Sequence, residues 1–198
     1  MPIFSKEQIK LFHIHIPKTA GRYITTLFKS NSFDITYNNF DYLVEGYELP
    51  HLWYPLYENI PVQDAVHFVI VRDPVEKFKS SLKNWKDFYN LDENFLDIED
   101  FDIDYFVKNS IENEFSSFFV PQWKFITDKT FVWKYEFGFG DEFFSWIKKN
   151  LKVDIRQPDQ LEEYPRFTYD FVKTPKISSH VESMIRDYYK KDYEIFGY

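Results

Sequence analysis

Two stretches of the chain share one pattern, in which an apolar run is followed by a short polar turn and then by apolar residues at helical spacing. In the first stretch the apolar run covers Leu11–Ile16, and helical spacing follows over residues 22–30. In the second, the run covers Ala65–Val71, and helical spacing continues from Pro74 to about Tyr89, with Asp73 placed to cap that helix. Continuous apolar runs are typical of strands buried on both faces of a parallel sheet. The pattern therefore predicts two strand–turn–helix units.

The remaining pattern extends this alternation of strands and helices. Residues 130–135 alternate like a strand, and Asp141 is placed to cap a helix that ends near Asn150. Residues 105–119 are predicted to be helical. Ser179 and Glu182 have the spacing of a capping box, which predicts a helix from there through Lys191. The expected architecture is an α/β fold with a mainly parallel sheet, formed by residues 1–198 as a single domain.

Composition narrows the function classes. The net charge of -8 and the pI of about 5.2 argue against broad binding to nucleic acid or to anionic membranes. The chain has no cysteine, which excludes disulfides and thiolate metal sites and favours the reducing cytoplasm. It shows neither a secretory signal pattern nor the run of roughly 18 apolar residues that a membrane span needs. We therefore expect a cytoplasmic location.

An acidic segment raises the question of calcium. Asp100, Asp102 and Asp104 alternate as in an EF-hand loop. That loop needs a glycine next and a glutamate at its twelfth position, where this chain has Tyr105 and Ile111. A solvated acidic loop is the better interpretation.

The first turn has the residues of an anion-binding loop. Where a turn leads into a helix, backbone N–H groups point outward without partners, and Lys18 lies beside them. Neither the Walker A motif nor the dinucleotide fingerprint is present, because Gly21 is the only glycine here and Lys18 precedes it. The residues alone predict an anion site on an α/β protein.

The two turns together resemble a known family. HIPKTAG after the first strand and VIVRDPVEKFKSSL around the second are similar to the nucleotide-binding motifs of sulfotransferases that use 3′-phosphoadenosine 5′-phosphosulfate (PAPS). The nearest likeness is to the carbohydrate branch that includes the heparan and chondroitin enzymes, and the ending DYYKKDYEIFGY is also similar to it. The resemblance implies a P-loop-like three-layer fold with helices flanking a central, mainly parallel sheet.

The resemblance also assigns roles to individual residues. It implies that a phosphosulfate loop binds the 5′ end of PAPS through backbone amides of 19–22, with Lys18 on the bridging oxygen of the leaving group. This loop consists of Pro17, Lys18, Thr19, Ala20, Gly21 and Arg22. Arg72 and Ser80 would hold the 3′-phosphate. The chain departs from the family at Lys77, where a second arginine is usual, and at Arg22, where a small hydroxyl residue is usual.

A proton acceptor for the substrate hydroxyl is expected between the two motifs. His51 lies there, in a segment rich in proline and aromatic residues, where carbohydrate members of the family have a catalytic histidine. A histidine can accept a proton near neutral pH, since its ordinary pKa is about 6.5. Glu45 and Glu48 are the alternative bases. The aromatic residues nearest His51 are candidates to line an acceptor groove or to be core: Trp53, Tyr54 and Tyr57.

The other histidines are expected to be structural. His13 and His15 share one face of the first strand, and an H-x-H pair can bind a metal, but no third ligand lies nearby in the sequence. A buried or loop-supporting role is therefore favoured for this pair. His67 lies within a strand and His180 beside a helix cap.

These expectations lead to one favoured function and two alternatives. The favoured function is in-line transfer of a sulfuryl group from PAPS to a hydroxyl of a glycan or glycan-like acceptor, releasing 3′-phosphoadenosine 5′-phosphate (PAP) without a metal. The alternatives are a P-loop kinase-like phosphotransferase and a non-catalytic nucleotide- or glycan-binding module. Retention of Lys18, Arg72 and His51 favours the enzyme. Without a membrane anchor, a bacterial or viral source is expected; the acceptor and the oligomeric state are left open.

Overall fold

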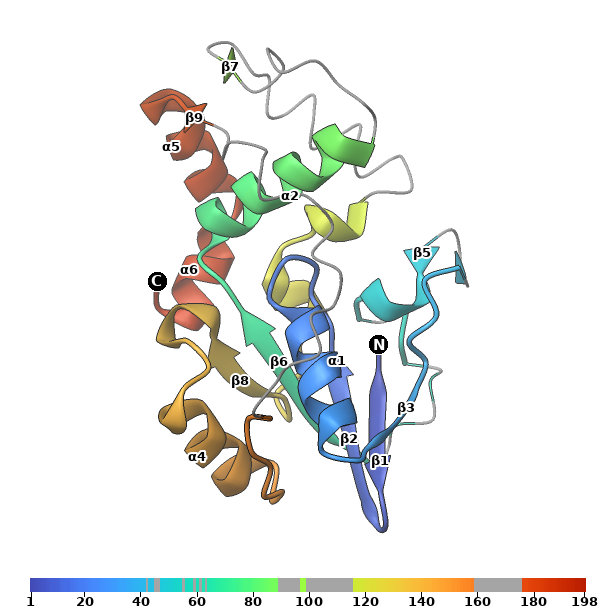
Figure 1. Ribbon diagram of the computed structural model, residues 1–198. Helices are drawn as coiled ribbons and strands as arrows, with labels where there is room; N and C mark the ends of the chain where they lie inside the picture. The colour runs from blue at the N-terminus through green and yellow to red at the C-terminus, as the bar shows by residue number, and fades with distance from the viewer. Residues whose placement is uncertain are drawn as a thin grey trace. The chain divides into compact units, whose positions relative to one another are not determined.

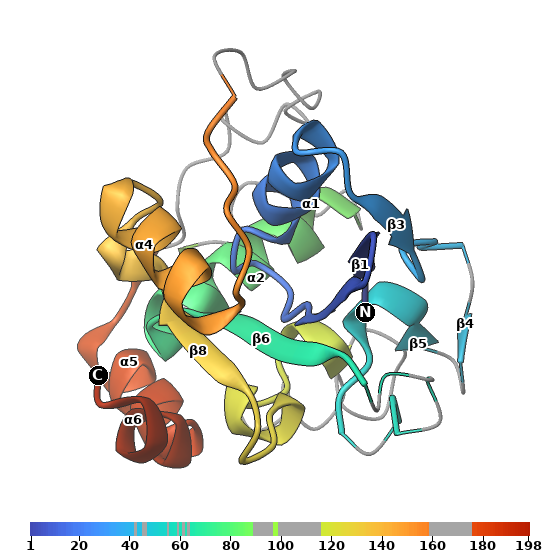
Figure 2. The same cartoon turned by 90° about the horizontal axis from the view of Figure 1, so that it is seen from below.

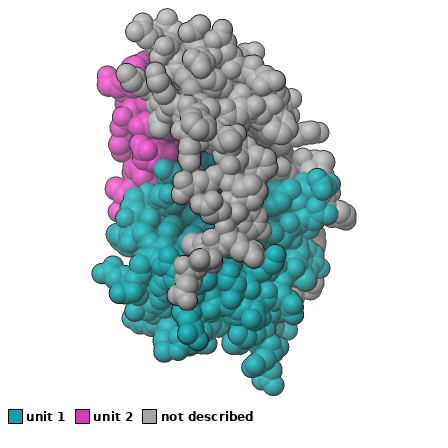
Figure 3. Space-filling model, viewed as in Figure 1, with its two compact units in different colours: residues 1–72, 124–164 teal, residues 73–123, 165–198 magenta. Residues whose placement is uncertain are grey.

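The chain divides into two compact units, each built from two separate segments. The computed structural model describes residues 1–41, 43–44, 47–54, 56–58, 60, 62, 64–88, 97–98, 116–158 and 176–198. Unit 1 comprises Met1–Arg72 and Lys124–Tyr164, and unit 2 comprises Asp73–Trp123 and Pro165–Tyr198 (Figure 3). That residues 1–198 form a single domain stays a prediction.

Unit 1 contains a five-stranded sheet with the order β3-β1-β2-β6-β8 (Figure 1). Its strands are β1 (Ile3–Lys6), β2 (Ile9–Ile14), β3 (Asp34–Thr36), β6 (Val66–Val71) and β8 (Phe131–Lys134). Strands β2, β6 and β8 run parallel, whereas β1 pairs antiparallel with both β2 and β3. The α/β class is confirmed, but the sheet is mixed, because β1 and β2 form a hairpin that the sequence pattern did not predict.

Two helices cover one face of this sheet, as Figure 2 shows. They are α1 (Gly21–Ser30) and α4 (Asp141–Asn150), and apolar side chains of both belong to the same buried cluster as those of the sheet. Phe28 of α1 stacks on Phe4 of β1, with ring centroids 4.4 Å apart. Asp141 does not cap α4: the N-cap is Gly140, and Asp141 is the first residue of the helix. Its negative charge, in the first turn, still interacts favourably with the dipole of the helix.

Short elements complete the description of the chain outside the main helices and strands. They are β4 (Leu43–Val44), β5 (Tyr47–Glu48), η1 (Leu49–His51), η3 (Ser116–Phe118), η4 (Gln122–Phe125) and η5 (Tyr135–Phe137). Strands β4 and β5 pair antiparallel. The η1 turn is buried throughout and carries the candidate base at its end.

The described residues of unit 2 are mainly helical. Its elements are α2 (Pro74–Phe88), α5 (Ser179–Tyr188), α6 (Lys190–Phe196) and the short parallel pair β7 (Asp97–Ile98) and β9 (Lys176–Ile177). The predicted apolar stripe of α2 forms a core with residues of α5 and the segment before η4: Val75, Phe78, Leu82, Phe119, Val181, Ile185 and Tyr189. Ser178, not Ser179, caps α5, since its side chain accepts the Val181 N–H. The helix also ends at Tyr188, and α6 continues as a separate helix.

A buried carboxylate ties the end of unit 2 to its middle. Asp192 of α6 is fully buried and accepts N–H bonds from Gln122 and Trp123, both of 2.9 Å. Burial raises the pKa of Asp192, while those two N–H bonds and the nearby Lys77 charge oppose the rise. Lys77 is itself buried and donates from Nζ to the carbonyl of Phe118 at 2.7 Å.

Some predictions lie outside the described residues. These are the acidic Asp100–Asp104 spacing and the part of the predicted 105–119 helix before Ser116. Where the chain is described, no helix is long and apolar enough to cross a membrane.

Candidate active site

The loop between β2 and α1 has the backbone conformation of an anion cradle. Lys18 and Ala20 both have left-handed backbones, with φ of 67° and 73°, and Thr19 between them does not. Such an alternation turns successive N–H groups toward the same side of the loop. The Thr19 hydroxyl is buried and donates to the carbonyl of Ile16 at 2.8 Å, which holds the turn closed.

Among the described residues, the N-terminus of α1 has neither a side-chain cap nor an acidic residue in its first turn. Its N-cap is Ala20. The first turn carries Arg22 instead, although a cation is unfavourable at the positive end of a helix dipole. N–H groups at a helix start need an acceptor from somewhere, so this end of α1 suits an anion.

Gly21 is required by a close approach of His15. A Cβ built on Gly21 would lie 1.7 Å from Nε2 of His15, so no larger residue fits without moving that imidazole. His15 in turn stacks on His13, with centroids 5.4 Å apart and planes 15° apart. The two histidines therefore share a face as predicted, and both are buried.

Burial keeps these two imidazoles neutral. The pKa of His13 is lowered well below its ordinary value by burial and by the charges of His15 and the amino terminus. The pKa of His15 is lowered by burial and by the charges of His51, the amino terminus and Arg22. Within the described part of the chain, neither nitrogen of His13, nor Nδ1 of His15, has a hydrogen-bond partner. Across the described residues, no group of three or more His, Cys, Asp or Glu is arranged to hold a metal ion.

Arg72 lies beside the loop, as the parallel strands require. Strands β2 and β6 are parallel neighbours, so the residues after Ile14 and Val71 lie at the same edge of the sheet. Nη1 of Arg72 donates to the carbonyl of Lys18 at 3.3 Å, and its Cζ lies 4.6 Å from the ring centroid of Tyr135, which follows β8. Three strand ends thus place Lys18 and Arg72 at one locus.

His51 packs behind the loop. Its ring centroid lies 4.7 Å from that of His15, with the planes 66° apart, and 5.4 Å from that of Phe40. His51 is only 5% exposed, whereas Phe40 is 41% exposed. Glu45 and the side chain of Glu48 lie outside the described residues, so the choice among the three candidate bases stays open.

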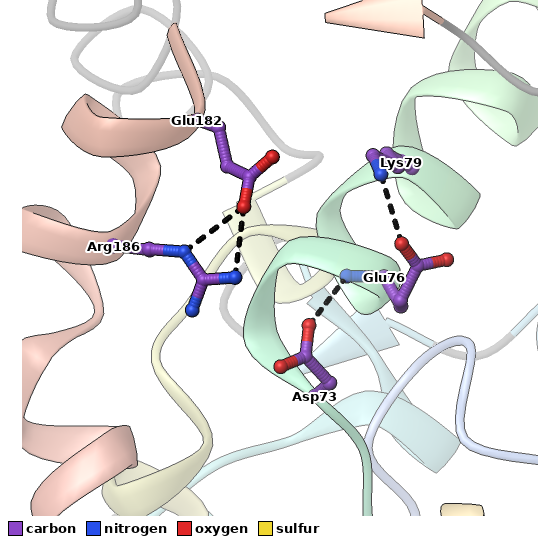
Figure 4. A network of polar contacts seen from close by, with 5 residues as sticks. All are labelled: Asp73, Glu76, Lys79, Glu182 and Arg186. Atoms are coloured by element: carbon purple, nitrogen blue, oxygen red, sulfur yellow. Dashed lines mark hydrogen bonds and ion pairs between the residues drawn. The ribbon is translucent and has the colours of Figure 1, made fainter. Parts of the chain in front are cut away.

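The second turn differs from the first in having its own cap. Asp73 accepts the Glu76 N–H at 3.0 Å at the start of α2, as predicted, and Glu76 pairs with Lys79 at 2.8 Å (Figure 4). In the same unit Arg186 donates to Glu182 from both Nε and Nη2 (Figure 4). Ser80 of α2 is half-buried and belongs to unit 2, whereas the first loop and Arg72 belong to unit 1.

The predicted acceptor-lining aromatic residues separate into different environments. Tyr57 is core: it is 3% exposed and donates from its hydroxyl to the carbonyl of Phe125 at 2.7 Å. Tyr54 is 44% exposed, and Trp53 is half-buried. Sequence reasoning missed Phe40, which no motif marks, although it is the exposed aromatic residue that contacts His51.

Comparisons with protein-family models, with curated proteins and with solved structures gave no match. The chemistry of this site is therefore inferred from its own residues: an uncapped basic loop, an adjoining arginine and a buried histidine behind them.

Proposed function

We propose that the chain is a PAPS-dependent O-sulfotransferase acting on a carbohydrate or glycan-like hydroxyl, built on a P-loop-like three-layer α/β fold. The observation that carries this proposal is the uncapped, basic start of α1. Ala20 offers no cap, the first turn has Arg22 in place of a carboxylate, and Arg72 bonds to the Lys18 carbonyl. A cation in the first turn of a helix costs about 0.3–1 kcal/mol, which a bound anion would reverse.

The roles of the residues follow from the charge that develops in sulfuryl transfer. The acceptor oxygen forms a bond to sulfur as the bond from sulfur to the 5′-phosphate oxygen breaks, and PAP leaves. Lys18 and the amides of 19–22 stabilise the negative charge that grows on the departing oxygen. Arg72 and Ser80 hold the 3′-phosphate, so that the donor is fixed at both ends. His51 accepts the proton of the acceptor hydroxyl.

The burial of His51 supports a second candidate, a non-catalytic module that binds the nucleotide. A base must contact the acceptor hydroxyl, and His51 is 5% exposed beneath Phe40. Catalysis by His51 therefore requires its ring to become accessible when the acceptor binds, for example by a movement of the exposed Phe40 ring that contacts it. A binding module would need no such movement.

Calorimetric titration with PAP tests the proposal. Wild type is expected to bind PAP, and Arg72→Ala is expected to bind it about 10–100-fold more weakly, the value of a charge-assisted contact of about 1.5–3 kcal/mol. Arg156→Ala removes an equal charge from an exposed position of the same unit and is the matched control. Absence of PAP binding by wild type would refute the cofactor assignment.

The same preparation separates the enzyme from the binding module. His51→Ala is expected to bind PAP as wild type does but to release no PAP from PAPS in the presence of alkyl and aryl glycosides. Turnover retained by His51→Ala would move the base role to a glutamate. PAP binding without turnover by wild type, across the glycoside panel, would favour the binding module.

A further inference from the structure

His15 lies between the two parts of the proposed site. On one side its Nε2 occupies the space next to Gly21, where a Cβ would come within 1.7 Å. On the other side its ring makes a T-shaped contact with the ring of His51, with centroids 4.7 Å apart and planes 66° apart. One imidazole therefore contacts both the first residue of α1 and the candidate base.

The surroundings of His15 favour an apolar ring more than an imidazole. Its ring stacks on His13, and His13 stacks on Phe68 at 4.8 Å. The Nδ1 atom of His15 is buried without a hydrogen-bond partner, which costs about 1–3 kcal/mol relative to an apolar group of the same shape. Packing alone does not account for a histidine here, since an apolar side chain would avoid that cost.

We infer that His15 is a positioning residue that holds the His51 imidazole at a fixed distance from the start of α1, so that the base and the anion loop keep one geometry. The inference rests on the proposed function for the role of His51 and of the loop. The packing that carries it is independent of which anion binds.

The protonation state of His15 is compatible with this role. Its pKa is lowered by burial first and then by His51, the amino terminus and Arg22, so His15 is neutral at neutral pH. Among the residues that the structure describes, these groups, with His13 beside the ring, are the titratable or charged groups that act on His15. A neutral neighbour does not oppose the positive charge that His51 gains when it takes a proton, whereas a second imidazolium would.

Histidine-ring NMR of the folded chain tests the inference through His51 itself. His15→Phe keeps a ring of similar shape and removes both nitrogens. We expect it to change the ring-nitrogen shifts of His51 and to move its titration midpoint by about half a pH unit or more. His67→Phe is the matched control, because His67 lies in the same sheet and contacts Phe12 and the Val62 carbonyl. Unchanged His51 signals in a folded His15→Phe variant would overturn the inference.

A size-exchange pair tests the contact with the loop. Gly21→Ala is expected to displace His15, to shift the His51 signals and to weaken PAP binding about 10-fold or more, the loss of at least one hydrogen bond from the loop to a charged group. The double variant Gly21→Ala with His15→Ala makes room for the new methyl group and is expected to recover PAP binding while the His51 signals stay altered. If Gly21→Ala or His15→Phe does not fold, the double variant alone decides, because wild-type His51 signals in it would contradict the inference.

The two proposals fail separately. If wild type does not bind PAP, the sulfotransferase assignment is lost, and the response of His51 to His15→Phe still decides whether His15 positions it. If wild type binds PAP but the His51 signals do not change in His15→Phe or in Gly21→Ala, only the positioning role of His15 is lost.

Discussion

The two strand–turn–helix units of this chain start their helices in opposite ways. Helix α2 begins with Asp73, whose carboxylate accepts the Glu76 N–H, followed by a proline. Helix α1 begins with Ala20 in a left-handed conformation, with no side-chain cap and with Arg22 in its first turn. The protein itself caps the second start, whereas under the proposed function a bound anion would serve the first. The same sequence pattern therefore occurs with a capped and with an uncapped helix start, and the cap residue distinguishes them.

A carboxylate placed at the start of α1, like that of Asp73 at the start of α2, is expected to have the largest effect, which is on PAP affinity. Ala20→Asp brings a carboxylate to the start of α1, where it would repel the anion and occupy its N–H groups. We expect PAP affinity to fall about 100-fold, or about 2.7 kcal/mol, which is the scale of two partly screened charges at contact distance. Ala20→Asn has the same shape without the charge, and it tolerates a left-handed backbone equally well. If calorimetry shows that both variants bind PAP equally well, the assignment of the anion to this loop is refuted.

A pH dependence of stability is expected from the region around the first loop, because buried imidazoles lie behind that loop. The pKa of His13 is lowered in the folded chain, so the unfolded chain takes up the proton first as pH falls below about 6.5. The stability from the neutral ring is complete above that pH and is lost as pH falls toward the lowered value, at up to about 1.4 kcal/mol per pH unit.

Urea unfolding at a series of pH values measures this loss. His13→Phe, which suits a ring stacked between aromatic neighbours, should flatten the slope of unfolding free energy against pH by that amount. His180→Asn is the control, because His180 is exposed on α5 and stays hydrated in both states. Equal slopes in wild type and His13→Phe would show that His13 is not held neutral.

The smallest effect is expected at the second turn. Asp73→Ala removes the cap of α2 and should lower the free energy of unfolding by about 1 kcal/mol, with no loss of PAP affinity. Asp73→Ser keeps a capping oxygen without the charge and should recover most of the stability. Thermal unfolding with PAP titration checks both variants. Weaker PAP binding by the stable Asp73→Ser variant would mean that this carboxylate serves the ligand as well as the helix.

The strongly periodic elements could be predicted, because their signals are local. Helix α1, strand β6 and helix α2 match the predicted boundaries within about one residue, and the Asp73 cap is confirmed. Strand β1 was missed because it has four residues and joins β2 through Glu7, a non-glycine residue with φ of 53°. Its pairing depends on a tertiary partner, which no local pattern reveals.

The proximity of Arg72 to the first loop follows from the sheet, whereas the packing around that loop could not be predicted. Parallel strands bring their carboxyl ends together, and Arg72 bonds to the Lys18 carbonyl. The assignment of these residues to PAPS stays a prediction. The contacts of His15 with Gly21 and His51 join residues 6 and 36 positions apart, and alternation along a strand gives only the face on which a side chain lies. For the same reason Tyr57 was grouped with its exposed neighbour Tyr54, although its hydroxyl is committed to the Phe125 carbonyl.

The Asp192 contact has a consequence for how unit 2 is made. Its two hydrogen bonds join α6 to residues 69 and 70 positions earlier, so this contact order is high. During synthesis the N–H groups of Gln122 and Trp123 emerge from the ribosome long before their acceptor does, and until then they stay bonded to water. We therefore expect unit 2 to complete its folding only after residue 192 has been released. A chain truncated before α6 would leave the N–H groups of Gln122 and Trp123 without this acceptor.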